Sequence, residues 1–273
     1  MLSSIRNLFF PAFVFAVFCT ANPTFAEEHS SFTTFYTPRF TLHIEETKSE
    51  AKTISLSDSQ LAARALKTLN NTHSELTRIF QEDTNGNVEL RFLSPAEFRK
   101  HTGAPEWTSA MYLKDEISIP ITPASIRPSE MNRALRHEYV HAFVAQISHY
   151  KCPAWLDEGV AQIIEGPANP QLAPALSQWA SENPIFPLNE LRNGFTTMDD
   201  YAVPAAYAQS FFATRKLIQS KGFSAIVKYL KALSVGKDEK AAFKLAFNQE
   251  QAEFEKSLAD SVTRWVRSGK TAL

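Results

Sequence analysis

Hydrophobic and polar positions predict a chain whose two halves differ in structure. Residues 40–44 alternate apolar and polar side chains as a half-buried strand does, residues 88–93 predict a second strand, and residues 110–121 show strand alternation again. Between the first two strands, apolar residues recur at spacings of three, four or seven, which predicts an amphipathic helix that begins near Ser57. Its apolar stripe consists of Leu61, Ala65, Leu69, Leu76 and Phe80.

Beyond a linker at residues 123–128, helical periodicity continues almost to the last residue. Residues 129–150 predict a helix capped by Ser129, and a further helix has Pro153 in its first turn and Gly166 just past its end. We therefore expect an α+β fold in a single domain, residues 39–273. Its small N-terminal α/β lobe with a mixed sheet spans residues 39–122, and a mainly α-helical lobe spans residues 123–273.

The first 26 residues have the features of a secretory signal peptide. Arg6 precedes an apolar run at residues 8–21, and Thr24-Phe25-Ala26 is a small-residue cleavage site. A membrane anchor is the alternative, but Pro11 breaks the run, which is shorter than the roughly 20 residues that span a bilayer. We expect an exported protein, periplasmic or secreted, with no stable membrane insertion after cleavage, and a mobile leader at residues 27–38.

Charge and cysteine content narrow the possible partners. The 28 basic and 29 acidic residues nearly balance, and loss of Arg6 takes the net charge from −1 to about −2, so we expect no nucleic-acid partner. Removal of 26 of the 273 residues leaves 247, enough for a sizeable core. Cys19 leaves with the signal peptide, so Cys152 has no internal disulfide partner and is expected to be a small buried hydrophobe.

The chemistry is concentrated in His137-Glu138-Tyr139-Val140-His141. Two histidines four residues apart lie on one face of a helix, at the spacing that places both imidazoles on one tetrahedral zinc ion. Glu138 is then close to the metal and can take a proton from the zinc-bound water. Two solvent-facing histidines on an ordinary helix are the alternative for this motif alone.

A third ligand is needed at such a site, and Trp155-Leu156-Asp157-Glu158-Gly159-Val160-Ala161 supplies one. Sixteen residues separate His141 from Glu158, which is enough to end one helix, turn, and bring an antiparallel helix back toward the metal. Glu158 is therefore predicted to face His137 and His141.

These two motifs, HEYVH and WLDEGVA, resemble those of the gluzincin zinc peptidases, most closely the exported bacterial proteins with a peptidase MA-like domain. The resemblance covers roughly residues 110–222. It implies a thermolysin-like catalytic domain that acts on a peptide or protein substrate. It also implies one Zn²⁺ ion bound by His137, His141 and Glu158, with Glu138 as the catalytic base.

A softer resemblance concerns Tyr207, which opens a helix where related proteins carry a tyrosine that can hydrogen-bond the developing oxyanion; Tyr201 is a second candidate. Two features depart from the family pattern. No Gly-x-Met-Glu-Asn segment for capture of a free amino terminus is present, although residues 109–112 occupy about the right place as a cleft-edge strand. Gln162 also stands where thermolysin-like enzymes have an aspartate that orients a histidine, so Asp157 or another residue must support the ligands.

Two other functions fit the same residues. One is an exported protein that binds zinc without catalysis, although such a site has no chemical need for Glu138. The other is a zinc hydrolase of a non-peptide amide or ester, because the same water attack serves any carbonyl.

Overall fold

The computed structural model describes residues 31–46, 56–106, 108–167, 169–195 and 197–269. All strands of the described residues, with two helices between them, come before a region of helices alone, so the expected α+β organisation with a mixed sheet before a mainly helical region is confirmed. The strands are β1 (Phe32–Tyr36), β2 (Phe40–Glu45), β3 (Val88–Leu93), β4 (Met111–Leu113) and β5 (Glu116–Pro120). The helices are α1 (Asp58–Phe80), α2 (Pro95–Thr102), α3 (Pro128–Ser148), α4 (Ala154–Ile164), α5 (Leu172–Glu182), α6 (Val203–Lys221), α7 (Phe223–Ser234), α8 (Glu239–Phe247) and α9 (Gln251–Arg267).

The sheet has the strand order β1-β2-β3-β5-β4. Its three central strands β2, β3 and β5 are parallel, and β1 and β4 are antiparallel to their neighbours. The parallel pair β2 and β3 is connected through α1, as parallel strands require a crossover. Lys114 and Asp115 turn β4 into β5 with φ angles of 50° and 64°, the left-handed values that tight hairpins prefer. The hairpin leaves β4 as the edge strand that contacts α3.

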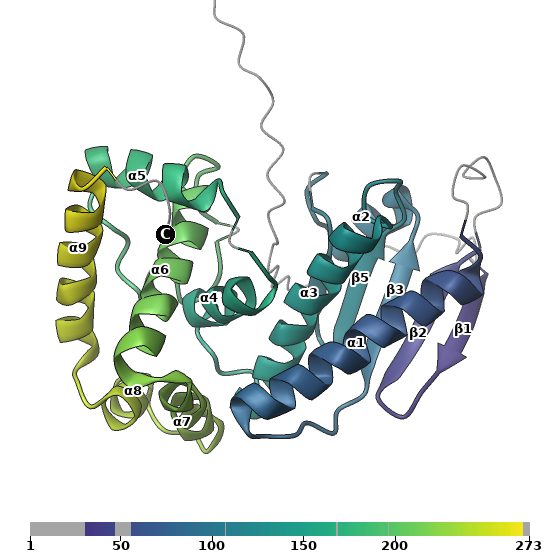
Figure 1. Cartoon of the computed structure of the whole chain (residues 1–273), viewed down its shortest axis with the longest axis horizontal. Coiled ribbons are helices and arrows are strands. Elements are labelled where there is room, and N and C mark those ends of the chain that lie inside the picture. The colour runs from purple at the N-terminus through teal and green to yellow at the C-terminus, as the bar shows by residue number, and fades with distance from the viewer. Residues whose placement is uncertain (1–30, 47–55, 107, 168, 196, 270–273) are drawn as a thin grey trace, which may run out of the picture.

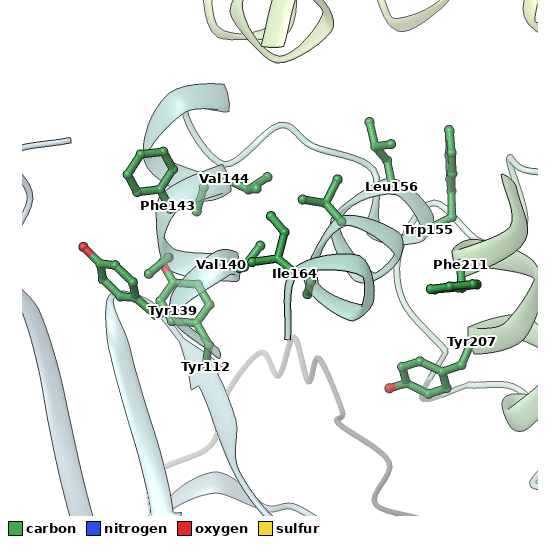
Figure 2. Packing of buried hydrophobic residues seen from close by; sticks show 14 of the residues in the cluster. Tyr112, Tyr139, Val140, Phe143, Val144, Trp155, Leu156, Ile164, Tyr207 and Phe211 are labelled. Carbon is green, nitrogen blue, oxygen red and sulfur yellow. The ribbon is translucent and has the colours of Figure 1, made fainter. Parts of the chain in front are cut away.

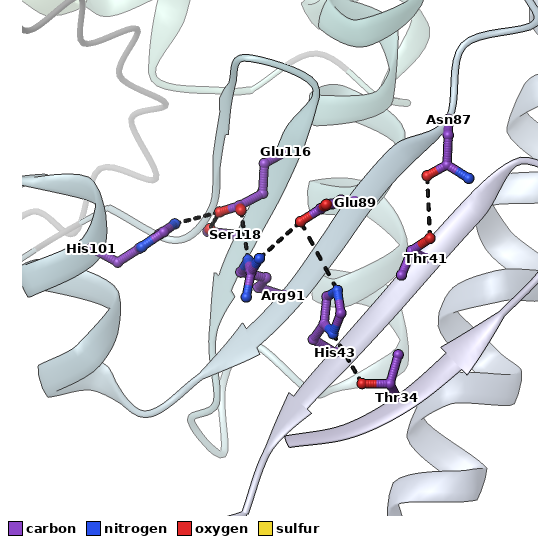
Figure 3. Close-up of polar contacts among 9 residues, drawn as sticks. All are labelled: Thr34, Thr41, His43, Asn87, Glu89, Arg91, His101, Glu116 and Ser118. Atoms are coloured by element: carbon purple, nitrogen blue, oxygen red, sulfur yellow. Dashed lines mark hydrogen bonds and ion pairs between the residues drawn. The ribbon is translucent and has the colours of Figure 1, made fainter. Parts of the chain in front are cut away.

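The two faces of the sheet differ in chemistry. One face carries buried residues such as Leu42, Leu90 and Ile117, and α1 and α3 pack side by side over it (Figure 1). The opposite face carries a partly exposed polar network that includes Arg91 and Glu116 (Figure 3). The main core therefore lies between the sheet and the helices.

The helical region continues from α3 through α4 to the remaining helices (Figure 1). Helix α4 packs against both α3 and α6. Gly159 of α4 makes the second contact close, because a Cβ atom there would lie 2.0 Å from Thr214 Oγ1 and 2.5 Å from the carbonyl oxygen of Ser210. The chain at Gly159 thus has to lack a side chain for α6 to approach α4.

Three expectations need correction. Residues 32–36, assigned to a mobile leader, form β1, since phenylalanine, tyrosine and threonine suit an edge strand that pairs with β2. Helix α3 begins at Pro128 with no side-chain cap from Ser129, because proline is favoured at the first helical position. Pro153 is the residue before α4 and does not lie in its first turn.

The proposed signal peptide, residues 1–26, lies outside the described residues. Within the part of the chain that is described, no helix is both long and apolar enough to cross a membrane. Cys152 is a free thiol packed against the core, in agreement with its expected role.

Candidate metal centre

Helices α3 and α4 bring the predicted ligands together because they run in opposite directions. Helix α3 ends at two left-handed residues, His149 and Tyr150, with φ angles of 52° and 59°, and α4 starts directly after Pro153. His137 therefore meets the C-terminal end of α4, where Glu165 lies, and His141 meets its N-terminal end, where Asp157 lies.

His137, His141 and Glu158 form a group whose possible ligand atoms lie within 4.8 Å of one another. Glu158 Oε2 is 3.5 Å from His137 Nε2, and Glu158 Oε1 is 3.8 Å from His141 Nε2. With metal–ligand bonds of about 2.0–2.2 Å, a tetrahedral ion separates its ligand atoms by roughly 3.3–3.6 Å. Two imidazole nitrogens and one carboxylate at these separations fit a zinc ion that keeps one position open.

The surroundings of these ligands favour a cation. Four carboxylates, from Glu138, Asp157, Glu158 and Glu165, are each at most 6% exposed. Burial lowers the pKa of the His137 imidazole, but Glu158 and Glu165 outweigh this effect and raise the pKa to about 10. Buried carboxylates need a compensating positive charge, which a divalent ion bound between them provides.

Glu138 differs from the other carboxylates in its contacts. Burial raises its pKa to about 7, although both histidines of the group oppose this shift. The main chain of Tyr112 on the edge strand β4 hydrogen-bonds the carboxylate, but its Oε1 atom is buried with no hydrogen-bond partner among the described residues. A buried carboxylate oxygen without a hydrogen-bond partner calls for an explanation, which can be a bound water molecule or a part in catalysis.

Two carboxylates of α4 approach the outer nitrogens of the histidines. Asp157 Oδ2 lies 3.0 Å from His141 Nδ1, as the sequence suggested for this residue. The corresponding atom of His137 is hydrogen-bonded to Glu165 Oε2 at 2.7 Å. Sequence reasoning missed Glu165, which follows the last residue of α4 and belongs to no motif. Gln162, at the position of the usual aspartate, instead donates to the carbonyl oxygen of Tyr207.

The edge strand also supports the ligands. The ring of Tyr112 stacks on that of His141, with centroids 6.5 Å apart and planes 20° from parallel. Tyr112 donates a 3.0 Å hydrogen bond to Asp115 in the β4–β5 turn, and Tyr150 at the end of α3 donates to the same carboxylate. The hairpin is thereby attached to the helix that carries the histidines.

Tyr207 lies on α6, which packs against the side of α4 opposite to α3. Figure 2 shows its hydroxyl directed toward the side on which Tyr112 lies. Burial raises the pKa of this hydroxyl well above its usual value, and the charges of Glu158 and Glu138 raise it further, so it stays protonated. Phe195 packs edge-on against its ring, with centroids 4.8 Å apart. Tyr201 is 52% exposed and contacts Trp179 instead.

A helix with the HExxH pair, followed by an antiparallel helix with a glutamate ligand, defines the class of zinc metallopeptidases. The chain belongs to the Peptidase MA superfamily, whose sequence profile matches residues 102–264. This match confirms the family resemblance of the two motifs. Zinc is the metal that the family and the ligand group indicate.

The fold is similar to two crystal structures of the M1 zinc metallopeptidase from Deinococcus radiodurans, one of them of a point mutant. The mutant structure is 16% identical, with a TM-score of 0.44, and the match covers 85% of this chain and 52% of that chain. The other is 16% identical, with a TM-score of 0.41, and the match covers 84% and 50%. This chain thus spans about half the length of those proteins. No curated protein sequence matches it.

Proposed function

We propose that this protein hydrolyses peptide bonds with one zinc ion bound by His137, His141 and Glu158, and with Glu138 as the general base. The observation that carries the proposal is the buried Oε1 of Glu138, which has no hydrogen-bond partner among the described residues and lies beside a group of metal ligands. A zinc site that served only to join two helices would have no use for this carboxylate.

The chain's own residues have distinct parts in the reaction. When bound, zinc supplies Lewis acidity that polarises the scissile carbonyl and acidifies a water molecule. The Glu138 carboxylate accepts the proton of the attacking water and afterwards delivers it to the leaving amine. The protonated Tyr207 hydroxyl donates a hydrogen bond to the carbonyl oxygen as negative charge develops there.

The proposal extends to the finer assignments made from sequence. We infer a thermolysin-like arrangement of the two lobes, in which residues 39–273, together with strand β1 that precedes them, act as one catalytic domain. We also infer that residues 1–26 export the protein to the periplasm or the medium, where it acts on a peptide or protein substrate.

The test compares the purified protein with a chelator-treated sample and with Glu138→Gln, measuring zinc content and cleavage of a mixed peptide library. We expect zinc in the untreated protein and in the variant, with cleavage lost on chelation and reduced about 10²–10⁴-fold in the variant. Glu130→Gln, at an exposed position of the same helix, is the matched control and should cleave normally.

Two results would contradict the proposal. Absence of zinc from the untreated protein would remove the metal site. Zinc without peptide cleavage, combined with turnover of an ester or a non-peptide amide, would shift the function to the other hydrolase class.

A further inference from the structure

Two short segments with an unusual backbone conformation meet near the metal centre. Lys114 and Asp115, in the turn between β4 and β5, have φ angles of 50° and 64°. His149 and Tyr150, at the end of α3, have φ angles of 52° and 59°. Residues other than glycine rarely adopt these left-handed values, and they keep them only where surrounding contacts hold them. Such residues concentrate at active sites, which points to a functional reason for the contact between the two segments.

One carboxylate joins the two segments. Asp115 Oδ1 accepts a 3.0 Å hydrogen bond from the Tyr112 hydroxyl, and Asp115 Oδ2 accepts one from the Tyr150 hydroxyl. Burial, together with the Asp115 carboxylate, raises the pKa of Tyr150 to about 12 and that of Tyr112 well above its usual value, so both hydroxyls stay protonated and donate. The carbonyl oxygen of Asp115 accepts from the Glu89 N–H at 2.9 Å, which fixes the residue on β3. Asp115 thus connects the sheet to the end of α3.

Tyr112 connects this carboxylate to the catalytic group. Its main-chain N–H hydrogen-bonds the carboxylate of Glu138, and its ring stacks on the imidazole of His141. Strand β4 is only three residues long, Met111–Leu113, and within the described part of the chain it pairs with β5 alone. A short edge strand has few hydrogen bonds of its own, so its position against α3 depends on the contacts made at the turn.

From these contacts we propose that Asp115 is a positioning residue for the general base. By accepting from both Tyr112 and Tyr150 it keeps β4 against α3, and so fixes the main-chain amide that holds the Glu138 carboxylate. A shift of about 1 Å in a catalytic group can lower a rate about 10²-fold, so a contact outside the reaction centre can control kcat. This inference rests on the proposed function, in which Glu138 is the general base.

The experiment compares the zinc-loaded wild-type protein with Tyr150→Phe and Asp115→Asn. It measures kcat and KM for peptide cleavage, zinc affinity by competition with a chelator, and hydrogen exchange of the Tyr112 amide by NMR. Tyr150→Phe removes one hydroxyl from a residue that is 61% exposed, so the fold should persist. Asparagine suits position 115, because it tolerates a left-handed backbone and keeps one acceptor oxygen.

The expected effects fall on turnover and on the edge strand. In Tyr150→Phe, kcat should fall about 5-fold, the equivalent of one hydrogen bond of ordinary net strength. In Asp115→Asn the fall should be larger, up to about 10²-fold. In both variants the Tyr112 amide should exchange faster, KM should change less than kcat, and zinc affinity should stay at the wild-type value.

Tyr36→Phe is the matched control. Tyr36 is also an exposed tyrosine, but it lies at the end of β1, the opposite edge strand of the same sheet. This variant should equal wild type in all four measurements.

Three results would overturn the inference. The first is wild-type kcat and wild-type exchange of the Tyr112 amide in both variants. The second is a lower kcat with unchanged exchange, since the effect would then not pass through Tyr112. The third is a fall in zinc affinity as large as the fall in kcat, because the contact would then support the metal ligands and not the base. If Asp115→Asn does not fold, Tyr150→Phe alone decides.

Amide exchange separates this inference from the proposed function. If wild type cleaves no peptide, the peptidase is contradicted. Faster exchange of the Tyr112 amide in Tyr150→Phe then still supports the positioning of β4 by Asp115, and unchanged exchange overturns it. If wild type cleaves peptides and both variants match it, the peptidase stands and the positioning role is removed.

Discussion

Glu165 and Glu116 have the same two kinds of neighbour in very different surroundings. Glu165 bridges His137 and Arg133 inside the metal centre, and Glu116 bridges His101 and Arg91 on the outer face of the sheet (Figure 3). The side chain of His137 is fully buried, whereas that of His101 is 47% exposed.

The difference shows what makes such a bridge part of a functional site. His137 has a second nitrogen 3.5 Å from Glu158, so its imidazole belongs to a ligand group, whereas His101 belongs to no such group among the described residues. Charge balance differs too. The outer network sets Arg91 and two protonatable histidines, His43 and His101, against Glu89 and Glu116, but the metal centre gathers four buried carboxylates around two histidines and Arg133. The number of buried carboxylates marks the metal centre.

The clearest test of this comparison removes Glu158, the metal ligand that has no counterpart in the outer network. In Glu158→Ala the two histidines keep their outer carboxylates but lose the third ligand. Zinc affinity should fall by more than the roughly 100-fold upper range for loss of an orienting partner. Metal content after dialysis measures this, and full zinc retention would exclude Glu158 from the ligand set.

A smaller effect is expected at Tyr207, which contributes no metal ligand. Tyr207→Phe should lower kcat about 10²–10³-fold, because one hydrogen bond to the developing oxyanion is lost. Zinc affinity should stay at the wild-type value. Tyr201→Phe is the control, and a loss of kcat there with normal turnover in Tyr207→Phe would assign the role to Tyr201.

The smallest effect is expected for a substitution in the outer network, which changes the free energy of unfolding. Burial raises the pKa of Glu116, but hydrogen bonds from His101, Arg91 and Ser118 outweigh it and lower the pKa to about 2. A depressed carboxylate pKa stabilises the fold above the unfolded value of about 4.3 and loses this contribution as the pH falls toward 2. Glu116→Gln should therefore reduce the free energy of unfolding by about 1–2 kcal/mol near pH 5–6, allowing for solvent screening.

Protonation of His101 sets the upper pH limit of this stabilisation. The hydrogen bond to Glu116 raises the pKa of His101, so its share of the stabilisation is present at low pH and is lost as the pH rises through the raised value. Denaturant unfolding of both proteins between pH 2 and pH 8 measures the difference. A difference that persists undiminished at pH 2 would show that the network acts through packing and not through charge.

Sequence reasoning was most successful where spacing alone fixes geometry. The four-residue interval between His137 and His141, and a third ligand after a short turn, predicted the ligand group that the structure brings together. The start of α1 near Ser57 was also predicted, and the structure shows that Ser57 caps it by accepting a hydrogen bond from the Gln60 main chain.

What was missed depends on tertiary contacts. Strand β1 has no buried residue, so its pattern resembles a polar leader until its pairing with β2 is known. Glu165 acquires its role only because α4 returns antiparallel to α3. The position of Glu165 was the signal available in the sequence. An acidic residue near the C-terminal end of an antiparallel α4 must face residues that precede His141 on α3.

The whole ligand group and its supporting carboxylates come from residues 137–165, on two adjacent helices joined by a short loop. Closing such a short loop costs little chain entropy, and contacts that are local in sequence form quickly. The ligand group therefore depends mainly on contacts that are local in sequence, whereas the sheet requires the pairing of strands that lie far apart in the chain, such as β2 with β3.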